Sequence, residues 1–530
     1  MTAADLVTID GSIFVGAERR HHGPTFRAVN PATGASIGPD VSEADAGDVA
    51  DACALAAAAA EPFGTLPPES RARFIEASAE AILAIGNGLV ETAMAETGLP
   101  RGRLDGERMR TVNQLRMFAA EVRAGHWLDA TIDPALPERA PPRPDIRRMN
   151  VPVGPVAVFG ASNFPLAFSV AGGDTASAFA AGCPVVVKGH PAHPGTGELV
   201  ARAIRAAVAT RGLPAGVFSF LPGRSNDLGA ALVADPQINA VGFTGSRRGG
   251  LALVEIARHR AEPIPVYAEM SSINPVVLLP GALAARAEAL GPAFAASLTL
   301  GAGQFCTNPG VVIAVDGPDL DRFIVAAEQA LAGAEPAVML TAGILESYDR
   351  GVAELDRHGS VRRIASGKPG ERRLCSAALF ETTADRFLAD RALGEEVFGA
   401  AAIIVRCRDA NDLVQVVTAL EGQLTATLHM DGADHGFAAK LLPLLRGRAG
   451  RVLANGWPTG VEVTAAMVHG GPFPATSDPR STSVGTLAMM RFVRPVSYQD
   501  IPDPLLPPAL QEGNPWRIPR RIEGTWERPA

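Results

Sequence analysis

The chain has 530 residues, which is too long for one ordinary domain and predicts two to four. Hydrophobic residues make up 47% and charged residues 20%, a balance that excludes a disordered scaffold. The net charge of −8 excludes the basic footprint of a nucleic-acid-binding protein, so we expect no nucleic-acid partner.

The five cysteines are scattered and never form a C-x-x-C pair. A disulfide framework is therefore not expected, and a reducing compartment, the cytoplasm, is the natural setting. The first ten residues lack a basic segment followed by an apolar core, so we expect no signal peptide. Two uncharged stretches, 151–173 and 290–315, are interrupted by Pro, Gly, Asn and Gln. We expect buried strands and turns there, and no membrane span.

The first part of the chain has Ala-rich periodicity near 3.6, which predicts helices over 45–60 and 69–94. A Pro-rich stretch at 134–144 predicts an extended connection. From 149 to 259, strand-like and helix-like segments alternate. The expected strands are 155–159, 184–187, 217–221 and 238–243, and the expected helices are 166–181, 196–211, 227–234 and 248–259. This alternation predicts an α/β fold with a parallel, doubly wound sheet, whose ligands bind at the carboxyl ends of its strands.

A second α/β unit is expected from about 266 to 467. Its expected strands are 276–279, 311–315, 401–405 and 424–429, and its expected helices are 282–300, 320–331 and 410–420. After it comes a β-like stretch at 482–492 and a Pro-rich, irregular end from 501. We detect no G-x-G-x-x-G after a strand and no G-x-x-x-x-G-K-[ST] motif, so a dinucleotide site would have to use other means.

The sharpest local signal is the segment GAGQFCTNPG at 301–310, which contains Cys306. Its glycines let the backbone approach a ligand closely and leave N–H groups free to donate. In such a loop the amide dipoles would favour the thiolate of Cys306, which would then be a nucleophile. The alternative is that Cys306 is a small buried hydrophobic residue, as free cysteines often are.

Three further side chains follow strand-like segments. Glu269 is flanked by uncharged residues; burial would raise its pKa and suit it to act as a general base, or it caps a turn. Asn163 lies between a strand and a helix, where its amide could donate to an oxyanion or close an Asx turn. Lys188 ends a strand, where it could reach a phosphate or ribose or be an exposed lysine without a role.

Six motifs occur in an order and spacing that resemble the aldehyde dehydrogenase superfamily. They are SNFP, VVVK, FTGS, AEMSSINP, GQFCTNPG and EEVFGA, and the resemblance covers about 9–498. Two longer blocks, GASNFPLAFSVAGGDTASAFAAGCPVVVKGHPAHPGT and NGWPTGVEVTAAMVHGGPFPATSDPRSTSVGT, are similar to the branch that holds α-ketoglutaric semialdehyde (2,5-dioxovalerate) and fatty-aldehyde dehydrogenases. The resemblance implies oxidation of an aldehyde to a carboxylate through a cysteine thioester.

The resemblance implies that Cys306 is the nucleophile, Glu269 the general base and Asn163 an oxyanion donor. It also implies a set of cofactor contacts and no metal site. Lys188 would contact the adenosine ribose, Glu396 the nicotinamide ribose, and Gly245 and Ser246 would open a helix facing the pyrophosphate. The expected cofactor set is completed by Phe398 and His190.

The expected cofactor is NADP⁺, with NAD⁺ possible. NAD-preferring relatives often carry an acidic residue three positions after the lysine, where this chain has Pro191. Without that carboxylate a 2′-phosphate would meet no like-charge repulsion, and Lys188 or His190 would bind it. A second departure is Ser271-Ser272, where many relatives have a Gly pair after the glutamate.

The resemblance further implies a domain division and a homo-oligomer. The cofactor-binding domain would comprise 1–123 and 149–265, the catalytic domain 266–477, and a small β oligomerisation extension with the tail 124–148 and 478–530. A homodimer or homotetramer is expected. Three alternatives stay open: another aliphatic or fatty aldehyde as substrate, a CoA-acylating reaction, which the presence of Glu269 argues against, and a catalytically silent binding or structural protein.

Overall fold

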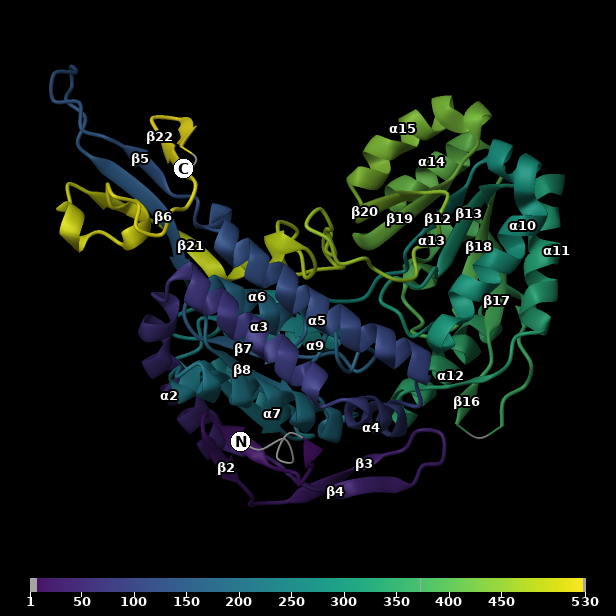
Figure 1. Cartoon of the computed structure of the whole chain (residues 1–530). Coiled ribbons are helices and arrows are strands. Elements are labelled where there is room, and N and C mark those ends of the chain that lie inside the picture. Colours follow the sequence, from purple (N-terminus) through teal and green to yellow (C-terminus); the bar gives the residue numbers. More distant parts are fainter. Residues whose placement is uncertain (1–6, 372, 528–530) are drawn as a thin grey trace.

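The computed structural model describes residues 7–371 and 373–527, in which two seven-stranded sheets occupy separate halves of the molecule (Figure 1). The first sheet has the order β11–β10–β7–β8–β9–β1–β2. Its strands are β1 (Ile13–Val15), β2 (Glu18–Arg20), β7 (Val156–Phe159), β8 (Val185–Gly189), β9 (Phe218–Pro222), β10 (Ala240–Thr244) and β11 (Val266–Glu269). Strands β7 to β11 are parallel to one another, and β1 is antiparallel to β9.

Helices bury both faces of the first sheet, as expected for a parallel sheet. Val156 and Val158 of β7 join a core formed with helices α3, α5, α6 and α7, whereas Ala157 and Phe159 join a second core with α2, α8 and α9. The helices of this half are α2 (Ala46–Gly64), α3 (Pro68–Ala84), α4 (Asn87–Thr97), α5 (Arg101–Ala124), α6 (Gly173–Ala181), α7 (Pro194–Thr210), α8 (Asn226–Ala234) and α9 (Arg247–Arg258). The doubly wound α/β arrangement predicted for 149–259 is confirmed.

The second sheet has the order β15–β17–β18–β13–β12–β19–β20, and only β15 is antiparallel to its neighbour. Its strands are β12 (Val276–Leu278), β13 (Val311–Val315), β15 (Arg362–Ser366), β17 (Ala378–Thr383), β18 (Ala401–Cys407), β19 (Gln423–His429) and β20 (Ala449–Ala454). Helices α10 and α11 cover one face and α13, α14 and α15 the other. The helices are α10 (Pro280–Thr299), α11 (Pro318–Ala332), α12 (Ala342–Arg357), α13 (Ala384–Ala389), α14 (Ala410–Ala419) and α15 (His435–Arg446).

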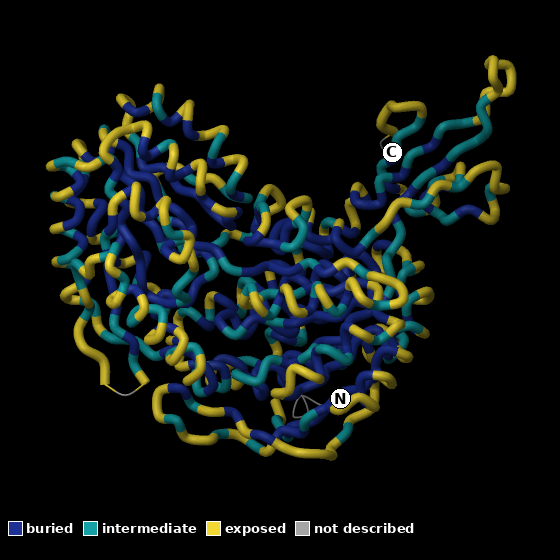
Figure 2. The backbone as a smooth tube through the Cα atoms, turned by 180° about the vertical axis from the view of Figure 1, so that it is seen from behind, coloured by how far each residue is buried: buried dark blue, intermediate teal, exposed yellow. Residues whose placement is uncertain are grey.

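A third, five-stranded sheet protrudes from the first half (Figure 1), in the order β21–β6–β5–β22–β23. Its strands are β5 (Thr131–Asp133), β6 (Ile146–Pro152), β21 (Val493–Gln499), β22 (Arg520–Ile522) and β23 (Thr525–Glu527). The Pro-rich stretch 134–144 connects β5 to β6, as predicted. Figure 2 shows buried residues concentrated in the two halves, while the protruding sheet carries many intermediate and exposed ones. Two short pairs remain, β3 (Thr25–Val29) with β4 (Ser36–Ser42) and β14 (Ala337–Val338) with β16 (Leu374–Cys375).

Three expectations differ from the structure. Segment 69–94 is two helices, α3 and α4, because Gly86 between them has a φ of +70° and breaks the helical path. The stretch 482–492 is not a strand: a 3₁₀ helix spans Thr486–Phe492 and the strand β21 starts only at Val493. Strand β11 pairs with β10, so the first sheet extends beyond the boundary expected at residue 265.

None of the helices in the described ranges, 7–371 and 373–527, is long and apolar enough to cross a membrane.

Candidate active site

Glu269 stands where the two halves meet. It is the last residue of β11, and residues 270–275 then cross to β12 in the second sheet. The edge of β11 is covered by a late segment of the chain, because the Met270 N–H donates to the Ala475 carbonyl and the Ser477 N–H to the Ala268 carbonyl. This pairing leaves Glu269 only 3% exposed and brings the residues around 475 beside it.

Cys306 follows a tight turn at the end of α10. Gly301, Ala302 and Gly303 all have φ between +57° and +70°, a left-handed conformation that glycine adopts without strain and alanine does not. A side chain at position 303 would lie 2.3 Å from the backbone of Gly399, so only glycine fits there. Asn274 holds the loop from the other side, since its Nδ2 donates to the Cys306 carbonyl at 2.9 Å.

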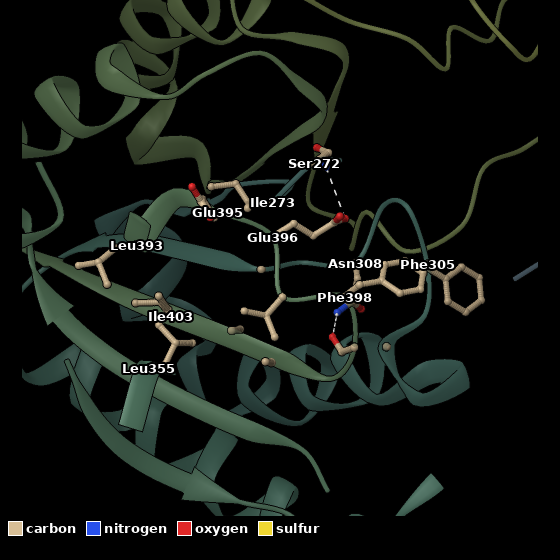
Figure 3. A pocket seen from close by; sticks show the side chains of 16 residues that line it. Ser272, Ile273, Phe305, Asn308, Leu355, Leu393, Glu395, Glu396, Phe398 and Ile403 are labelled. Carbon is tan, nitrogen blue, oxygen red and sulfur yellow. Dashed lines mark hydrogen bonds between the residues drawn. The ribbon is translucent and has the colours of Figure 1, made fainter. Parts of the chain in front are cut away.

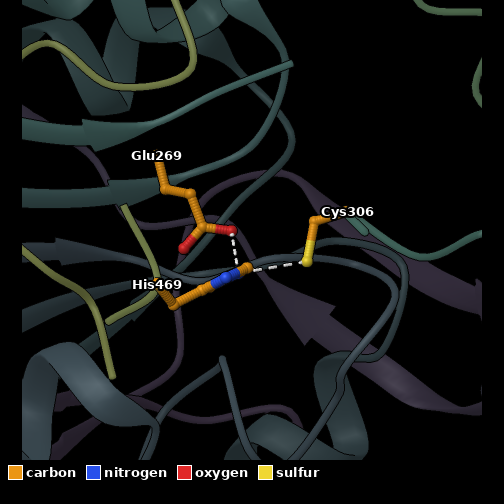
Figure 4. A group of neighbouring side chains, drawn as sticks. All are labelled: Glu269, Cys306 and His469. Carbon is orange, nitrogen blue, oxygen red and sulfur yellow. Dashed lines mark hydrogen bonds and ion pairs between the residues drawn. The ribbon is translucent and has the colours of Figure 1, made fainter. Parts of the chain in front are cut away.

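A histidine joins these two residues (Figure 4). Nε2 of His469 lies 3.2 Å from Sγ of Cys306 and 2.8 Å from Oε1 of Glu269. The backbone N–H of His469 donates to Oγ1 of Thr482 at 2.8 Å, and the Ser483 hydroxyl donates to Oε2 of Glu269. A half-buried thiol thus contacts a buried imidazole and a buried carboxylate, and the three groups can exchange protons.

The surroundings shift the pKa values of Cys306 and Glu269 in opposite directions. Burial raises the pKa of the Cys306 thiol well above its usual value, and the charge of Glu269 raises it further, while Arg110 lowers it. Burial would also raise the pKa of Glu269, but His469 and the Ser483 hydroxyl bring it below its usual value. The rise expected for Glu269 from burial alone is therefore wrong, and its partners keep it a carboxylate.

Asn163 lies beside the Cys306 loop. It is in the segment after β7, and its Nδ2 donates to the Gln304 carbonyl at 3.0 Å, two residues before the cysteine. Arg103 of α5 fixes the same segment by donating from Nη2 to the Asn163 carbonyl. A primary amide has two N–H donors, so Asn163 keeps one for another acceptor near Cys306.

The expected pyrophosphate contacts are at the start of α9. Ser246 is the N-cap of this helix and accepts from the Gly249 N–H at 3.2 Å, and Gly245 donates to the Glu269 carbonyl at 3.1 Å. Arg247 and Arg248 of the first turn line a cleft of about 1150 Å³ that reaches Glu396 on the other side. The Arg247 N–H donates to Oγ of Ser271 and its guanidinium pairs with Glu421 at 3.0 Å, so the positive end of the helix and the Arg248 side chain are what suit a pyrophosphate.

Glu396 and Phe398 lie in the segment before β18 and line a small pocket with Ser272 and Phe305 (Figure 3). Burial raises the pKa of Glu396 to about 7, although the Ser272 N–H donates to its Oε1 at 3.4 Å. A carboxylate at this wall of the cleft is the chemistry that ribose hydroxyls need. Together with the start of α9, it fits a dinucleotide cofactor across the cleft.

Lys188 and His190 are at the carboxyl end of β8, three strands away from β11. Burial lowers the pKa of Lys188 to about 8, and Glu43 opposes that shift. His190 stacks on His193 with ring centroids 5.2 Å apart and accepts from the Ala192 N–H. Burial lowers the pKa of His190 well below its usual value, and the charges of His193 and Lys188 add to this. Of Lys188 and His190, only Lys188 can therefore carry a positive charge near pH 7.

His469 is the site residue that the sequence interpretation missed. It lies in MVHGGP, far from any strand, inside a block already recognised as part of the family resemblance. The two glycines and the proline after it indicate a tight turn, and a histidine in such a turn is a candidate for a functional group.

The comparisons agree with the fold. The family model described as "Aldehyde dehydrogenase family" matches residues 18–472. The chain therefore belongs to the aldehyde dehydrogenase family, whose enzymes oxidise aldehydes with a nicotinamide cofactor, NAD(P)⁺.

Among the similar proteins is alpha-ketoglutaric semialdehyde dehydrogenase 2 of Azospirillum brasilense, 58% identical over 98% of this chain and 100% of its own length. The alpha-ketoglutaric semialdehyde dehydrogenase of Acinetobacter baylyi is 46% identical over 97% and 98%. An aldehyde dehydrogenase of Bacillus cereus, solved as a complex with NAD⁺, shares the fold, with a TM-score of 0.79 at 21% identity over 94% of this chain and 97% of that one.

Proposed function

We propose that this enzyme oxidises 2,5-dioxovalerate (α-ketoglutaric semialdehyde) to 2-oxoglutarate, with Cys306 as nucleophile. The substrate assignment is supported by the near full-length likeness to two enzymes of that name. The observation that carries the chemistry is the series of contacts from Cys306 through His469 to Glu269.

In the first step the Cys306 thiol loses its proton and its sulfur attacks the aldehyde carbon. Because the thiol has a raised pKa, it needs a base within reach, and Nε2 of His469 is 3.2 Å from Sγ. Nε2 then carries that proton and donates to Oε1 of Glu269, 2.8 Å away, so the carboxylate stabilises the imidazolium. The free N–H of the Asn163 amide and the backbone N–H of Cys306 receive the oxyanion of the thiohemiacetal.

Lys188, Ser246 and Glu396 would hold the nicotinamide cofactor, which would supply a hydride acceptor. Once the bound carbon has been oxidised, it is a thioester on Sγ of Cys306. Glu269, kept as a carboxylate by His469 and Ser483, then takes a proton from water. The water oxygen attacks the thioester carbon and the C–S bond breaks. His469 returns its proton to Sγ, which restores the thiol as the carboxylic acid leaves.

The main competing substrate class is the aliphatic aldehydes, because Phe164, Phe168 and Phe305 form an apolar cluster next to the cysteine. Steady-state turnover of the purified enzyme with 2,5-dioxovalerate, hexanal and longer aldehydes separates the two. We expect kcat/KM to be highest for 2,5-dioxovalerate. A higher kcat/KM for hexanal would overturn the assignment of 2,5-dioxovalerate as the substrate. Faster release of the thioester with coenzyme A than with water would show that the enzyme acylates coenzyme A and does not hydrolyse the thioester.

NADP⁺ is the proposed preferred cofactor. Pro191 puts no carboxylate where one would repel a 2′-phosphate, and Lys188 is the charge available to bind it. The alternative is equal use of both cofactors through the ribose and pyrophosphate contacts they share.

The domain roles and the assembly are also proposals. The first half would bind the cofactor and the second would carry the nucleophile, and the protruding β5–β6–β21 sheet would pair with another copy in a homodimer or homotetramer. The five free cysteines suit a reducing cytoplasm. An exposed sheet edge is an aggregation hazard in a monomer, so pairing would protect it. Light scattering that gives a mass near 55 kDa at micromolar concentration would refute the assembly.

A further inference from the structure

One face of α5 places buried charges around the catalytic centre. Arg103, Glu107 and Arg110 succeed one another at helical spacing, and Arg451 of β20 approaches from the second half. The pKa of each of the three guanidinium groups is lowered by burial and raised by an interaction with the Cys306 thiol. Three partly buried arginines therefore interact electrostatically with the reacting thiol.

Two of these arginines already serve the fold. Arg103 donates from Nη2 to the Asn163 carbonyl, and its Nε lies 4.0 Å from Oε2 of Glu107. Arg451 donates from Nη1 and Nη2 to the carbonyls of Pro458 and Gly460. Both groups hold a loop beside the active site. Each has a single buried nitrogen without a hydrogen-bond partner in the described part of the chain, which is too little for a two-point contact.

Arg110 is different. Its Nε and Nη2, the two nitrogens of one edge of the guanidinium plane, are buried, and neither has a hydrogen-bond partner among the described residues. Oε1 of the nearby Glu107 accepts from the backbone N–H groups of Leu166 and Ala167, and no carboxylate of residues 7–371 or 373–527 forms an ion pair with Arg110. A buried, unpaired guanidinium edge is costly, which is a reason to look for a partner outside the chain.

The rings under Arg110 connect it to the reacting atoms. Its Cζ lies 5.6 Å from the centroid of Phe164 and 5.1 Å from that of Phe168. Phe164 contacts Phe305, the neighbour of Cys306, at 5.4 Å between centroids, and Phe168 contacts His469 at 6.1 Å. These stacking contacts hold the guanidinium plane in place, and its charge is close enough to lower the pKa of the Cys306 thiol.

We propose that the Nε–Nη2 edge of Arg110 is the subsite for the distal carboxylate of the substrate, bound through two parallel hydrogen bonds. The proposal rests on the proposed substrate, 2,5-dioxovalerate, whose carboxylate is at the far end of a five-carbon chain from the aldehyde. A fork of two N–H donors matches a carboxylate in a way that a lysine or an apolar wall does not. The charge of Arg110 interacts with Glu107, but an unsubstituted aliphatic chain would leave the buried Nε–Nη2 edge without an acceptor, so Arg110 selects against fatty aldehydes although aromatic rings line the same region.

The test compares three aldehydes of equal length. 2,5-Dioxovalerate has the carboxylate and the 2-oxo group, 5-oxopentanoate has the carboxylate only, and pentanal has neither. For Arg110→Met we expect kcat/KM to fall about 100-fold with both carboxylates and to stay level or rise with pentanal. Arg110→Lys, which keeps the charge without the fork, should lie between. Arg116→Met on the exposed face of α5 is the matched control and should change none of the three.

A second measurement is independent of turnover. Calorimetry compares the binding of two reaction products, 2-oxoglutarate and pentanoate, of which only 2-oxoglutarate has the distal carboxylate and the 2-oxo group. We expect the wild-type enzyme to bind 2-oxoglutarate more tightly. Arg110→Met should remove most of this difference in affinity. If Arg110→Met does not fold, as melting curves would show, Arg110→Lys and the wild-type comparison of the ligands carry the test.

The outcomes separate the two proposals. Equal loss with all three aldehydes, together with a shifted pH profile of Cys306 alkylation by iodoacetamide, would show that Arg110 acts on the thiol and would overturn the subsite. No loss with either carboxylate would also overturn it. If the wild-type enzyme rejects 2,5-dioxovalerate but prefers 5-oxopentanoate to pentanal through Arg110, the subsite stands and the proposed substrate falls.

Discussion

The catalytic centre and the loop after β8 both hold buried ionisable side chains, but they differ in how those side chains are partnered. Glu269 keeps its charge because His469 and Ser483 contact it, so its pKa falls despite burial. Burial lowers the pKa of His190, and the charges of His193 and Lys188 lower it further, so its charge is lost. Burial therefore sets the charge of His190, whereas the partners of Glu269 override the effect of burial there.

Removing the nucleophile gives the largest expected effect. Cys306→Ala should lower kcat by about 10⁴-fold or more, because no other group can form the thioester. Cofactor binding and the melting temperature should change little, since a small side chain is replaced by a smaller one. Turnover measured alongside calorimetric binding of NADP⁺ checks this. Retention of more than a few per cent of wild-type kcat would disprove the assignment.

Glu269→Gln removes the carboxylate from the partnered site. Thioester formation should continue while hydrolysis slows by about 10²- to 10⁴-fold, the usual contribution of a general base. Stopped-flow measurement should therefore show a burst of reduced cofactor followed by slow turnover. Steady turnover at the wild-type rate, without a burst, would remove Glu269 from the mechanism.

His469→Gln tests the partner itself. The pKa of Glu269 is lowered by His469, so without the imidazole that pKa should rise and the carboxylate should be protonated over more of the acid range. The acid limb of the kcat profile should move to higher pH, and kcat/KM should fall about tenfold to 100-fold because the thiol loses its nearest base.

The exposed His259→Gln serves as the control for this substitution and should leave both the profile and the rate unchanged. An unchanged acid limb in His469→Gln would mean that another group sets the charge of Glu269.

The smallest effect on kcat/KM is expected from Lys188, in the loop after β8. Lys188 has a pKa of about 8 in the free enzyme, so it is protonated below that pH and neutral above it. The preference for NADP⁺ in kcat/KM, which reports free-enzyme groups, should be greatest below pH 8 and decline above it. Lys188→Met should lower the preference about tenfold at pH 7 and remove the pH dependence.

A decline centred near pH 6.5 would indicate His190 instead of Lys188. The buried, neutral ring makes that outcome unexpected. A clear NAD⁺ preference in the wild-type enzyme would mean that another residue binds the 2′-hydroxyl.

Much of the fold could be predicted because the buried parallel strands are short apolar runs that can be recognised in the sequence. The expected strand 311–315 coincides with β13, and the other predicted strands of the parallel sheets lie within a few residues of the observed ones. Cys306 and Glu269 could be proposed because each lies in a segment of small uncharged residues. Their roles remain proposals, and the structure adds that the two side chains meet.

The segment 482–492 shows why other parts could not be predicted. Its composition is β-like, but its side chains contact the active site instead of forming a strand. Thr482 accepts from the His469 N–H, and Ser483 donates to Glu269. These contacts are made with residues far away in the sequence, so no local pattern contains them. His469 was missed for the same reason, since its significance depends on Cys306, a partner 163 positions away.

The pairing of residues 475–477 with β11 has a consequence for the order in which the enzyme is made. Glu269 and the Ser483 hydroxyl that contacts it are 214 positions apart. During synthesis the N-terminal parts of a chain generally fold first, so both large sheets can form before His469 and Ser483 have left the ribosome. Until that late segment arrives, the carboxylate lacks the groups that hold its proton affinity down. The nascent enzyme can therefore form both large sheets before its active site is complete. Residues near the C-terminal end then supply the contacts that Glu269, from the middle of the chain, needs to act as a base.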